Sequence, residues 1–267
     1  MNTSELSPET GILRVDGVEV PFEWWGNRYD QPVLFFHDLG DQPGSFASVC
    51  STLLHQGYCC LCLGLPFHHN QLQNPEDFSS NSFTTKLSDT LSHNGISKYI
   101  LAAHSFGARF ALPLAARKPE LVKRLILICP DGFHPRSDIW YKPGEFPFFQ
   151  NILTKYDLPV KRLLSLMKPE STDREISEMI HVYRRYLLLS SEINLYSNGT
   201  MGLLYNIESP VDILWGKQDR EIPFHVAAEV SQHFRNATVY PLEQSGHYPI
   251  RDAPDEINQT LLQILAR

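Results

Sequence analysis

A serine stands between small residues in the segment Ala103-His104-Ser105-Phe106-Gly107. The apolar run over residues 99–102 predicts a buried strand, and residues 108–118 predict a helix. On a tight turn from strand to helix, a serine hydroxyl projects beyond the end of the sheet, and small residues two positions before and after it let the strand and the helix approach closely. The segment therefore predicts a serine nucleophile, with Ala103 in the place where glycine is more usual.

A serine hydroxyl is a weak nucleophile at neutral pH, so it needs a base and a group that orients the base. His247 follows a predicted strand over residues 237–242, and Asp219 lies in the loop after a predicted strand over residues 212–216. The chain order Ser105, Asp219, His247 fits a catalytic triad. We expect Ser105 to attack a carbonyl carbon, His247 to accept and return the proton, and Asp219 to orient His247.

Acyl transfer also builds negative charge on the carbonyl oxygen, which fixed backbone N–H groups stabilise, each typically by about a hundredfold or more in rate. A predicted strand over residues 33–36 ends in His37-Asp38-Leu39-Gly40. The amides of Leu39 and Phe106 are the expected donors of this oxyanion hole. A carboxylate aimed at the oxyanion would oppose its formation, so we expect the Asp38 side chain to turn outward and to accept hydrogen bonds from loop amides after Gly40.

Together these motifs resemble the α/β-hydrolase superfamily, in its single-domain form with a helical cap, and the resemblance covers nearly the whole chain. Many members carry His-Gly-x-Gly in the oxyanion loop, so Asp38 is a departure from the pattern. The resemblance favours Asp219 as the acid of the triad, while Asp131 holds the position that some members use instead. His37 and His104 are expected to support the site rather than to act as bases.

The elements that position these residues follow from the apolar pattern. Asp16-Gly17 predicts a hairpin turn between two strands. Further strands over residues 33–36, 58–63, 99–104 and 124–129 alternate with helices over about 46–56, 83–94 and 106–118. This alternation predicts an α/β fold with a mostly parallel sheet and helices on both faces. Ligands bind at the carboxyl ends of such strands, where Leu39, Ser105, Asp219 and His247 fall.

The alternation stops after residue 130. We expect residues 131–206 to form a helical cap inserted after the sixth strand, and residues 1–130 and 207–267 to form the core. Its aromatic content favours an apolar acyl or aryl substrate, and the candidate pocket residues are His68, Trp140, Phe149, Met167 and Tyr183. Basic residues also gather in this region: Lys161, Arg162, Arg174, Arg184 and Arg185. We favour the interpretation that these basic residues form a solvated helix face, and the alternative is that they dock an acidic acyl carrier protein.

Composition narrows the function classes. The chain of 267 residues has a formal net charge of -7 and a pI near 5.9, which argues against a nucleic-acid partner. It has no apolar run of 18 residues, so no membrane span is expected, and residues 1–10 lack the apolar core of a secretory signal, so we expect a cytoplasmic protein. The five cysteines, an odd number without paired Cys-x-x-Cys motifs, predict buried thiols, and we expect no metal and no cofactor.

The sequence therefore predicts a serine hydrolase that cleaves a carboxylic ester or thioester, from a small-molecule or carrier-bound acyl substrate, through an acyl-enzyme. A carbon–carbon bond hydrolase or an acyltransferase with the same triad is the enzymatic alternative. Asp38 keeps a third interpretation open, a non-catalytic ligand-binding or scaffold protein of the same fold.

Overall fold

The computed structural model describes residues 7–66, 78–133, 194–196 and 198–267. Within them, eight strands form one sheet in the order β1-β2-β4-β3-β5-β6-β7-β8. The strands are β1 (Glu9–Val15), β2 (Val18–Trp25), β3 (Gln31–Phe36), β4 (Tyr58–Leu63), β5 (Tyr99–His104), β6 (Val122–Ile128), β7 (Val211–Gly216) and β8 (Ala237–Leu242). β2 runs antiparallel to β1 and β4, and all other neighbours are parallel, which confirms the predicted mostly parallel sheet.

The burial of each strand follows its place in the sheet. β5 and β7 are buried along their whole length, as expected for parallel strands covered on both faces. β1, at the sheet edge, alternates exposed and partly buried residues. Asp16 and Gly17 turn the chain between β1 and β2 with φ values of 52° and 79°, the left-handed conformation that a two-residue hairpin turn requires.

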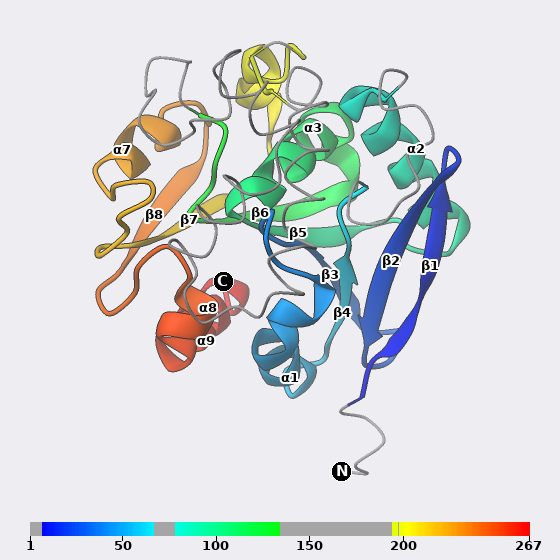
Figure 1. The fold of residues 1–267 in the computed structure, drawn as a ribbon, viewed down its shortest axis with the longest axis horizontal. Coiled ribbons are helices and arrows are strands. Elements are labelled where there is room, and N and C mark those ends of the chain that lie inside the picture. Colours follow the sequence, from blue (N-terminus) through cyan, green and yellow to red (C-terminus); the bar gives the residue numbers. More distant parts are fainter. Residues whose placement is uncertain (1–6, 67–77, 134–193, 197) are drawn as a thin grey trace, which may run out of the picture.

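Helices cover both faces of the sheet, as predicted (Figure 1). α1 (Ala47–Leu54) and α9 (Pro254–Leu265) lie together on one face, and α2 (Ser80–His93) and α3 (Ala108–Arg117) lie on the other. The short helix α7 (Val226–Ser231) packs against β7 and β8, and α8 (Pro249–Asp252) leads into α9. In the described part of the chain, no helix is long and apolar enough to cross a membrane.

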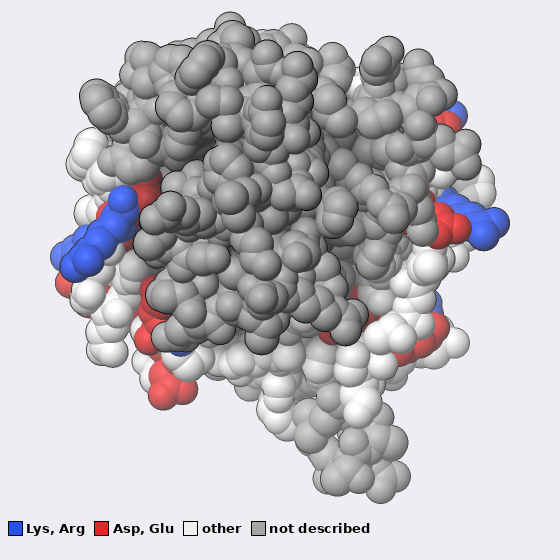
Figure 2. Space-filling view, in the orientation of Figure 1, with Lys and Arg blue, Asp and Glu red and all other residues white. Residues whose placement is uncertain are grey.

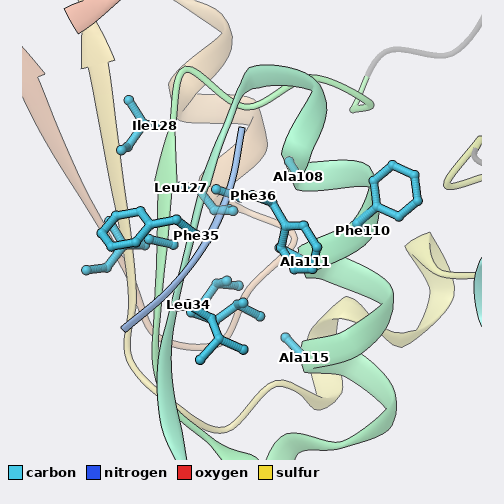
Figure 3. Packing of buried hydrophobic residues seen from close by; sticks show 14 of the residues in the cluster. Leu34, Phe35, Phe36, Ala108, Phe110, Ala111, Ala115, Leu127 and Ile128 are labelled. Carbon is cyan, nitrogen blue, oxygen red and sulfur yellow. The ribbon is translucent and has the colours of Figure 1, made fainter. Parts of the chain in front are cut away.

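The core is packed from both sides of β3. Neighbouring residues of a strand point to opposite faces, and Figure 3 shows Phe35 and Phe36 directed apart in this way. The ring of Phe35 lies 4.6 Å from that of Phe46, while the ring of Phe36 lies 6.2 Å from that of Phe110 in α3. Small side chains line the face of α3 that meets the sheet (Ala108, Ala111 and Ala115 in Figure 3), so the helix lies close behind the strand ends.

The segment between β6 and β7 is described only near its two ends. The Tyr196 hydroxyl donates a hydrogen bond of 2.6 Å to the carbonyl oxygen of Phe133. Arg117 of α3 donates to the Thr200 hydroxyl at 3.1 Å, and the 3-10 helix η7 (Met201–Asn206) packs against α3. Residues 134–193 lie outside the described residues, so the helical cap stays a prediction.

Several predicted strand bounds agree with the structure: β4, β5 and β8 occupy the residues expected. β6 begins two residues and ends one residue earlier than the predicted range of 124–129. Cys129 has a φ of 42°, which is far from the extended conformation of a strand. On the face shown in Figure 2, described acidic and basic side chains lie interspersed around the rim.

Candidate active site

Ser105 follows β5 directly and turns the chain sharply into α3. Its φ of 48° lies in the left-handed region, an uncommon conformation for a residue with a side chain, and such strain clusters at functional sites. The tight turn requires Gly107, because a Cβ atom there would lie 2.4 Å from the carbonyl oxygen of Phe36. Strand, turn and helix therefore have the geometry that the sequence predicts for a serine nucleophile.

The structure brings Ser105, His247 and Asp219 together. The Oγ atom of Ser105 lies 2.8 Å from Nε2 of His247, and Nδ1 of His247 lies 2.8 Å from Oδ2 of Asp219. The other carboxylate oxygen of Asp219 accepts the backbone N–H groups of Glu221 and Ile222, each at 2.8 Å. All members of the chain of hydrogen bonds are buried, with exposures of 5% for Ser105 and 6% for Asp219 and His247.

The surroundings of His247 suit a general base. Burial alone would lower its pKa, but the hydrogen bond and charge of Asp219, with the charges of Glu221 and Asp38, outweigh burial and raise the pKa above its ordinary value. In this network the neutral imidazole carries its proton on Nδ1. This N–H donates a hydrogen bond to Asp219, and Nε2 accepts a hydrogen bond from the Ser105 hydroxyl. His247 is thus oriented to take the hydroxyl proton.

Acidic side chains from the last two helices hold the loop that carries His247. Glu256 of α9 accepts the backbone N–H of Gln244 at 3.1 Å and the hydroxyl of Ser245 at 2.9 Å. Asp252 of α8 accepts the backbone N–H of Gly246 at 3.0 Å. Neither Glu256 nor Asp252 belongs to a motif that predicts this role. The available signal was Pro254-Asp255-Glu256, which marks the acidic first turn of a helix soon after the loop.

His104, the last residue of β5, supports the same loop from the position before Ser105. Its Nε2 lies 2.8 Å from the backbone oxygen of His247 and donates a proton to it. Burial lowers the pKa of His104 below its ordinary value, while the charge of Asp38 acts in the opposite direction. The expected supporting role of His104 thus takes the form of a direct hydrogen bond to the main chain of His247.

Asp131, the alternative acid, has another partner. Its Oδ2 accepts a hydrogen bond of 2.9 Å from Nε of Arg109, and both side chains are largely buried. The backbone N–H of Asp131 donates to the carbonyl oxygen of Ser105 at 3.0 Å. Asp131 therefore lies against the backbone of Ser105, and the geometry favours Asp219 as the partner of His247.

Asp38 does not turn outward, and that expectation is wrong. The side chain is only 8% exposed, and its Oδ1 accepts the backbone N–H of Phe106 at 3.3 Å. Burial alone would raise the pKa of Asp38, but His104, His247 and the backbone N–H groups of Leu39 and Phe106 outweigh it and lower the pKa, so the carboxyl is ionised. The physical reason is that a buried N–H without an acceptor is costly, and the Asp38 carboxylate accepts the buried Phe106 amide as well as the amide of Leu39.

The candidate pocket residues His68, Trp140, Phe149, Met167 and Tyr183 all lie outside the described residues.

All five cysteines are free and buried, and burial raises the pKa of Cys59 to about 12, so its thiol stays protonated. Among described side chains, Cys129, Asp219 and His247 place one potential metal ligand each within 4.8 Å of one another. The Asp219 and His247 atoms in this group already bond to each other.

Comparisons with known proteins agree with the fold. A model of the alpha/beta hydrolase family matches residues 33–260. The chain is 25% identical to the uncharacterized hydrolase YugF of Bacillus subtilis, over 94% of this chain and 96% of that protein. It is 26% identical to strigolactone esterase D14 of Arabidopsis thaliana, over 73% of this chain and 78% of that protein.

Solved structures with low sequence identity share the same architecture. The epoxide hydrolase VrEH1 from Vigna radiata superposes with a TM-score of 0.73 at 14% identity, covering 100% of this chain and 99% of that one. A thioesterase domain from the curacin biosynthetic pathway superposes with a TM-score of 0.69 at 18% identity, covering 96% of this chain and 99% of that one. With the family model matching most of its length, this chain belongs to the alpha/beta hydrolase family.

Proposed function

We propose that this protein is a serine hydrolase that cleaves a carboxylic ester or thioester with an apolar acyl or aryl group. The observation that carries the proposal is the continuous, buried chain of hydrogen bonds from Ser105 through His247 to Asp219, with 2.8 Å at each step. A serine without an adjacent base would be a weak nucleophile, so this arrangement supports covalent catalysis.

The reaction follows from the positions of the three side chains. His247 takes the hydroxyl proton at Nε2 while the Ser105 oxygen attacks the carbonyl carbon, and Asp219 stabilises the imidazolium that forms. The tetrahedral intermediate collapses as His247 gives its proton to the leaving alcohol or thiol, which leaves an acyl group on Ser105. Water then enters, loses a proton to His247 and attacks the acyl group, so that the carboxylic acid is released and the hydroxyl is restored.

The amides of Leu39 and Phe106 are the groups that would hold the oxyanion of this intermediate. Each amide has to lose its hydrogen bond to the Asp38 carboxylate before it can bind the oxyanion. One N–H group cannot donate a strong hydrogen bond to both anions at once. Asp38 is therefore the feature that also favours a second candidate function, binding of a ligand with little or no turnover.

The nature of the nucleophile favours acyl transfer over epoxide opening. Esterase and thioesterase appear in the names of similar proteins, and so does epoxide hydrolase. An acyl group on a serine oxygen is an ester, which water cleaves readily, whereas opening of an epoxide by serine would leave an ether that water does not cleave. Ester or thioester hydrolysis is therefore preferred, and a carbon–carbon hydrolase or an acyltransferase with the same residues remains the enzymatic alternative.

The carrier-bound form of the substrate is a further part of the proposal. The basic residues that would dock an acidic acyl carrier protein lie outside the described residues, and so do the predicted pocket residues. The docking partner and the apolar character of the acyl or aryl group are therefore predictions from the sequence.

Two measurements test the proposed function. A fluorophosphonate probe is expected to label the wild-type protein and not the Ser105→Ala variant, because only an activated serine reacts. A series of p-nitrophenyl esters of increasing acyl length is then expected to show turnover with a maximum that reports the pocket depth. Turnover of this series by Ser105→Ala at a tenth of the wild-type rate would contradict the assignment of the nucleophile.

A further inference from the structure

The space intended for the oxyanion is occupied by an anion of the protein itself. Oδ1 of Asp38 bonds to the amide of Phe106, the residue directly after the proposed nucleophile. The amide of Leu39, the second expected donor, also stabilises the charge on the Asp38 carboxylate. This carboxylate therefore takes up both donors that a substrate carbonyl oxygen needs.

Displacing this carboxylate is costly for a neutral ester. The Asp38 side chain is only 8% exposed, so water has little access to it. A carbonyl oxygen that enters in its place brings no positive charge, and the ionised carboxylate then lies close to an oxyanion as the tetrahedral intermediate forms. Two like charges in a site shielded from water repel each other strongly.

A second carboxylate near the reacting atoms increases this charge. Oε2 of Glu221 lies 3.9 Å from Nε2 of His247, the atom that faces the nucleophile. The guanidinium of Arg109, four residues after Ser105, is already paired with Asp131. A substrate that supplied its own positive charge would balance the displaced carboxylate.

We propose that Asp38 determines specificity: its carboxylate closes the oxyanion hole of the resting protein, and esters with a cationic group a few bonds from the scissile carbonyl open it more readily than neutral esters of the same shape. This inference rests on the proposed serine hydrolase and narrows its substrate class. It makes Asp38 a residue that touches the reacting atoms at the start of each cycle. The apolar acyl group proposed above is compatible with a cation in the leaving group.

A pair of thioesters of the same shape tests the charge preference. Butyrylthiocholine and 3,3-dimethylbutyl thiobutyrate differ in one charge, a quaternary ammonium against a tert-butyl group. We expect the wild-type protein to favour the cationic thioester in kcat/KM by roughly tenfold to a hundredfold, the size expected for one charge pair at a few ångströms in a partly shielded site.

Two variants separate the charge of Asp38 from its occupancy of the hole. Asp38→Asn keeps the shape and an oxygen that accepts the Phe106 amide, but it removes the charge. Asp38→Ala removes both. We expect the preference for the cationic thioester to fall at least tenfold in both variants. For the neutral thioester, kcat/KM is expected to rise in Asp38→Asn and to rise further, at least tenfold above wild type, in Asp38→Ala.

Asp41→Asn is the matched control, because it removes the same charge from the same loop. Its backbone N–H contacts the carbonyl oxygen of Asp38, while its side chain makes no described bond to the amides of the hole. We expect its preference for the cationic thioester to stay within about threefold of wild type. An equal loss of preference in Asp41→Asn and Asp38→Asn would overturn the inference, since it would indicate a general field rather than a residue in the hole.

A binding measurement gives a readout that does not depend on turnover. Phenylboronic acid adds its boron to the Ser105 oxygen and becomes an anionic tetrahedral adduct, with one hydroxyl directed into the hole. We expect it to bind Asp38→Ala at least tenfold more tightly than wild type, and Ser105→Ala not to bind it in this way. Unchanged affinity in both Asp38 variants would overturn the inference.

The outcomes distinguish the two proposals. If wild type hydrolyses both thioesters and the Asp38 variants show the same preference and affinity, the inference about Asp38 fails and the serine hydrolase stands. If neither wild type nor the Asp38 variants react with a fluorophosphonate or hydrolyse any ester, both proposals fail.

Discussion

Changing Asp219 or Asp131 to asparagine is expected to have opposite effects: the first mainly lowers kcat, and the second mainly lowers stability. Asp219→Asn removes the charge that stabilises the His247 imidazolium across a bond of 2.8 Å, and the amide offers His247 a donor where an acceptor is needed. Loss of the acid of a triad typically lowers kcat by about ten-thousandfold, or about 5.5 kcal/mol of transition-state stabilisation.

The same substitution is expected to have little effect on folding. The backbone N–H groups of Glu221 and Ile222 bond to Oδ1 of Asp219, an oxygen that asparagine retains. The free energy of unfolding is therefore expected to change by about 1 kcal/mol or less.

Asp131→Asn is expected to show the reverse pattern. It removes the charge of Asp131 from a pair in which Nε of Arg109 lies 2.9 Å from Oδ2 and the Arg109 side chain is only 5% exposed. Breaking a buried pair in this way typically costs about 3 kcal/mol or more of stability. We expect kcat to change less than about tenfold, because the carboxylate bonded to Nδ1 of His247 is that of Asp219.

Steady-state kinetics and urea unfolding, carried out on both variants, check these expectations. Asp212→Asn is the control, since Asp212 forms a buried pair with Arg124 at the opposite end of β7 from Asp219 and is expected to lose stability without loss of kcat. A large loss of kcat in Asp131→Asn with near-normal turnover in Asp219→Asn would refute the reasoning and assign the acid to Asp131.

Other expectations follow from the same geometry. Ser105→Ala and His247→Ala are each expected to lower kcat by about ten-thousandfold or more with unchanged circular dichroism, because the members of a triad act as a unit. His247 must be neutral to act as a base and its pKa is raised, so kcat/KM is expected to rise with pH through a midpoint above 6.5, and Glu221→Gln is expected to move that midpoint down in a pH-rate profile. Gly107→Ala is expected to cost about 2 kcal/mol or more in thermal unfolding, since its Cβ would meet the Phe36 carbonyl oxygen at 2.4 Å.

The architecture of this protein can be predicted from its sequence because parallel strands covered on both faces consist of apolar residues along their whole length. Continuous apolar runs such as those of β4 and β5 are typical of parallel strands covered on both faces, so their bounds follow from composition alone. The proximity of Ser105, Asp219 and His247 follows from the same rule, since each comes after a strand whose carboxyl end meets one edge of the sheet.

The orientation of Asp38 illustrates what a local pattern does not contain. The orientation of its side chain depends on the amides of Leu39 and Phe106, and Phe106 lies 68 positions away in the chain. No motif within the loop indicates this distant hydrogen bond. The support that Glu256 gives to the His247 loop is of the same kind, because it arises only when α9 packs beside that loop. Cys129 is another example, because the sequence gives no sign that a residue other than glycine adopts a left-handed φ there.

The hydrogen bond between Tyr196 and Phe133 has a practical consequence for protein engineering. This bond joins the two places where the described part of the chain ends and begins again. The ends of the segment 134–193 are therefore attached to neighbouring points of the fold. Closing such a gap with a few residues carries only a small entropic cost. Residues 134–193 are thus a natural unit for exchange between relatives, with Asp131 and Phe133 on one side and Tyr196 and Thr200 on the other retained as the fixed joint of the scaffold.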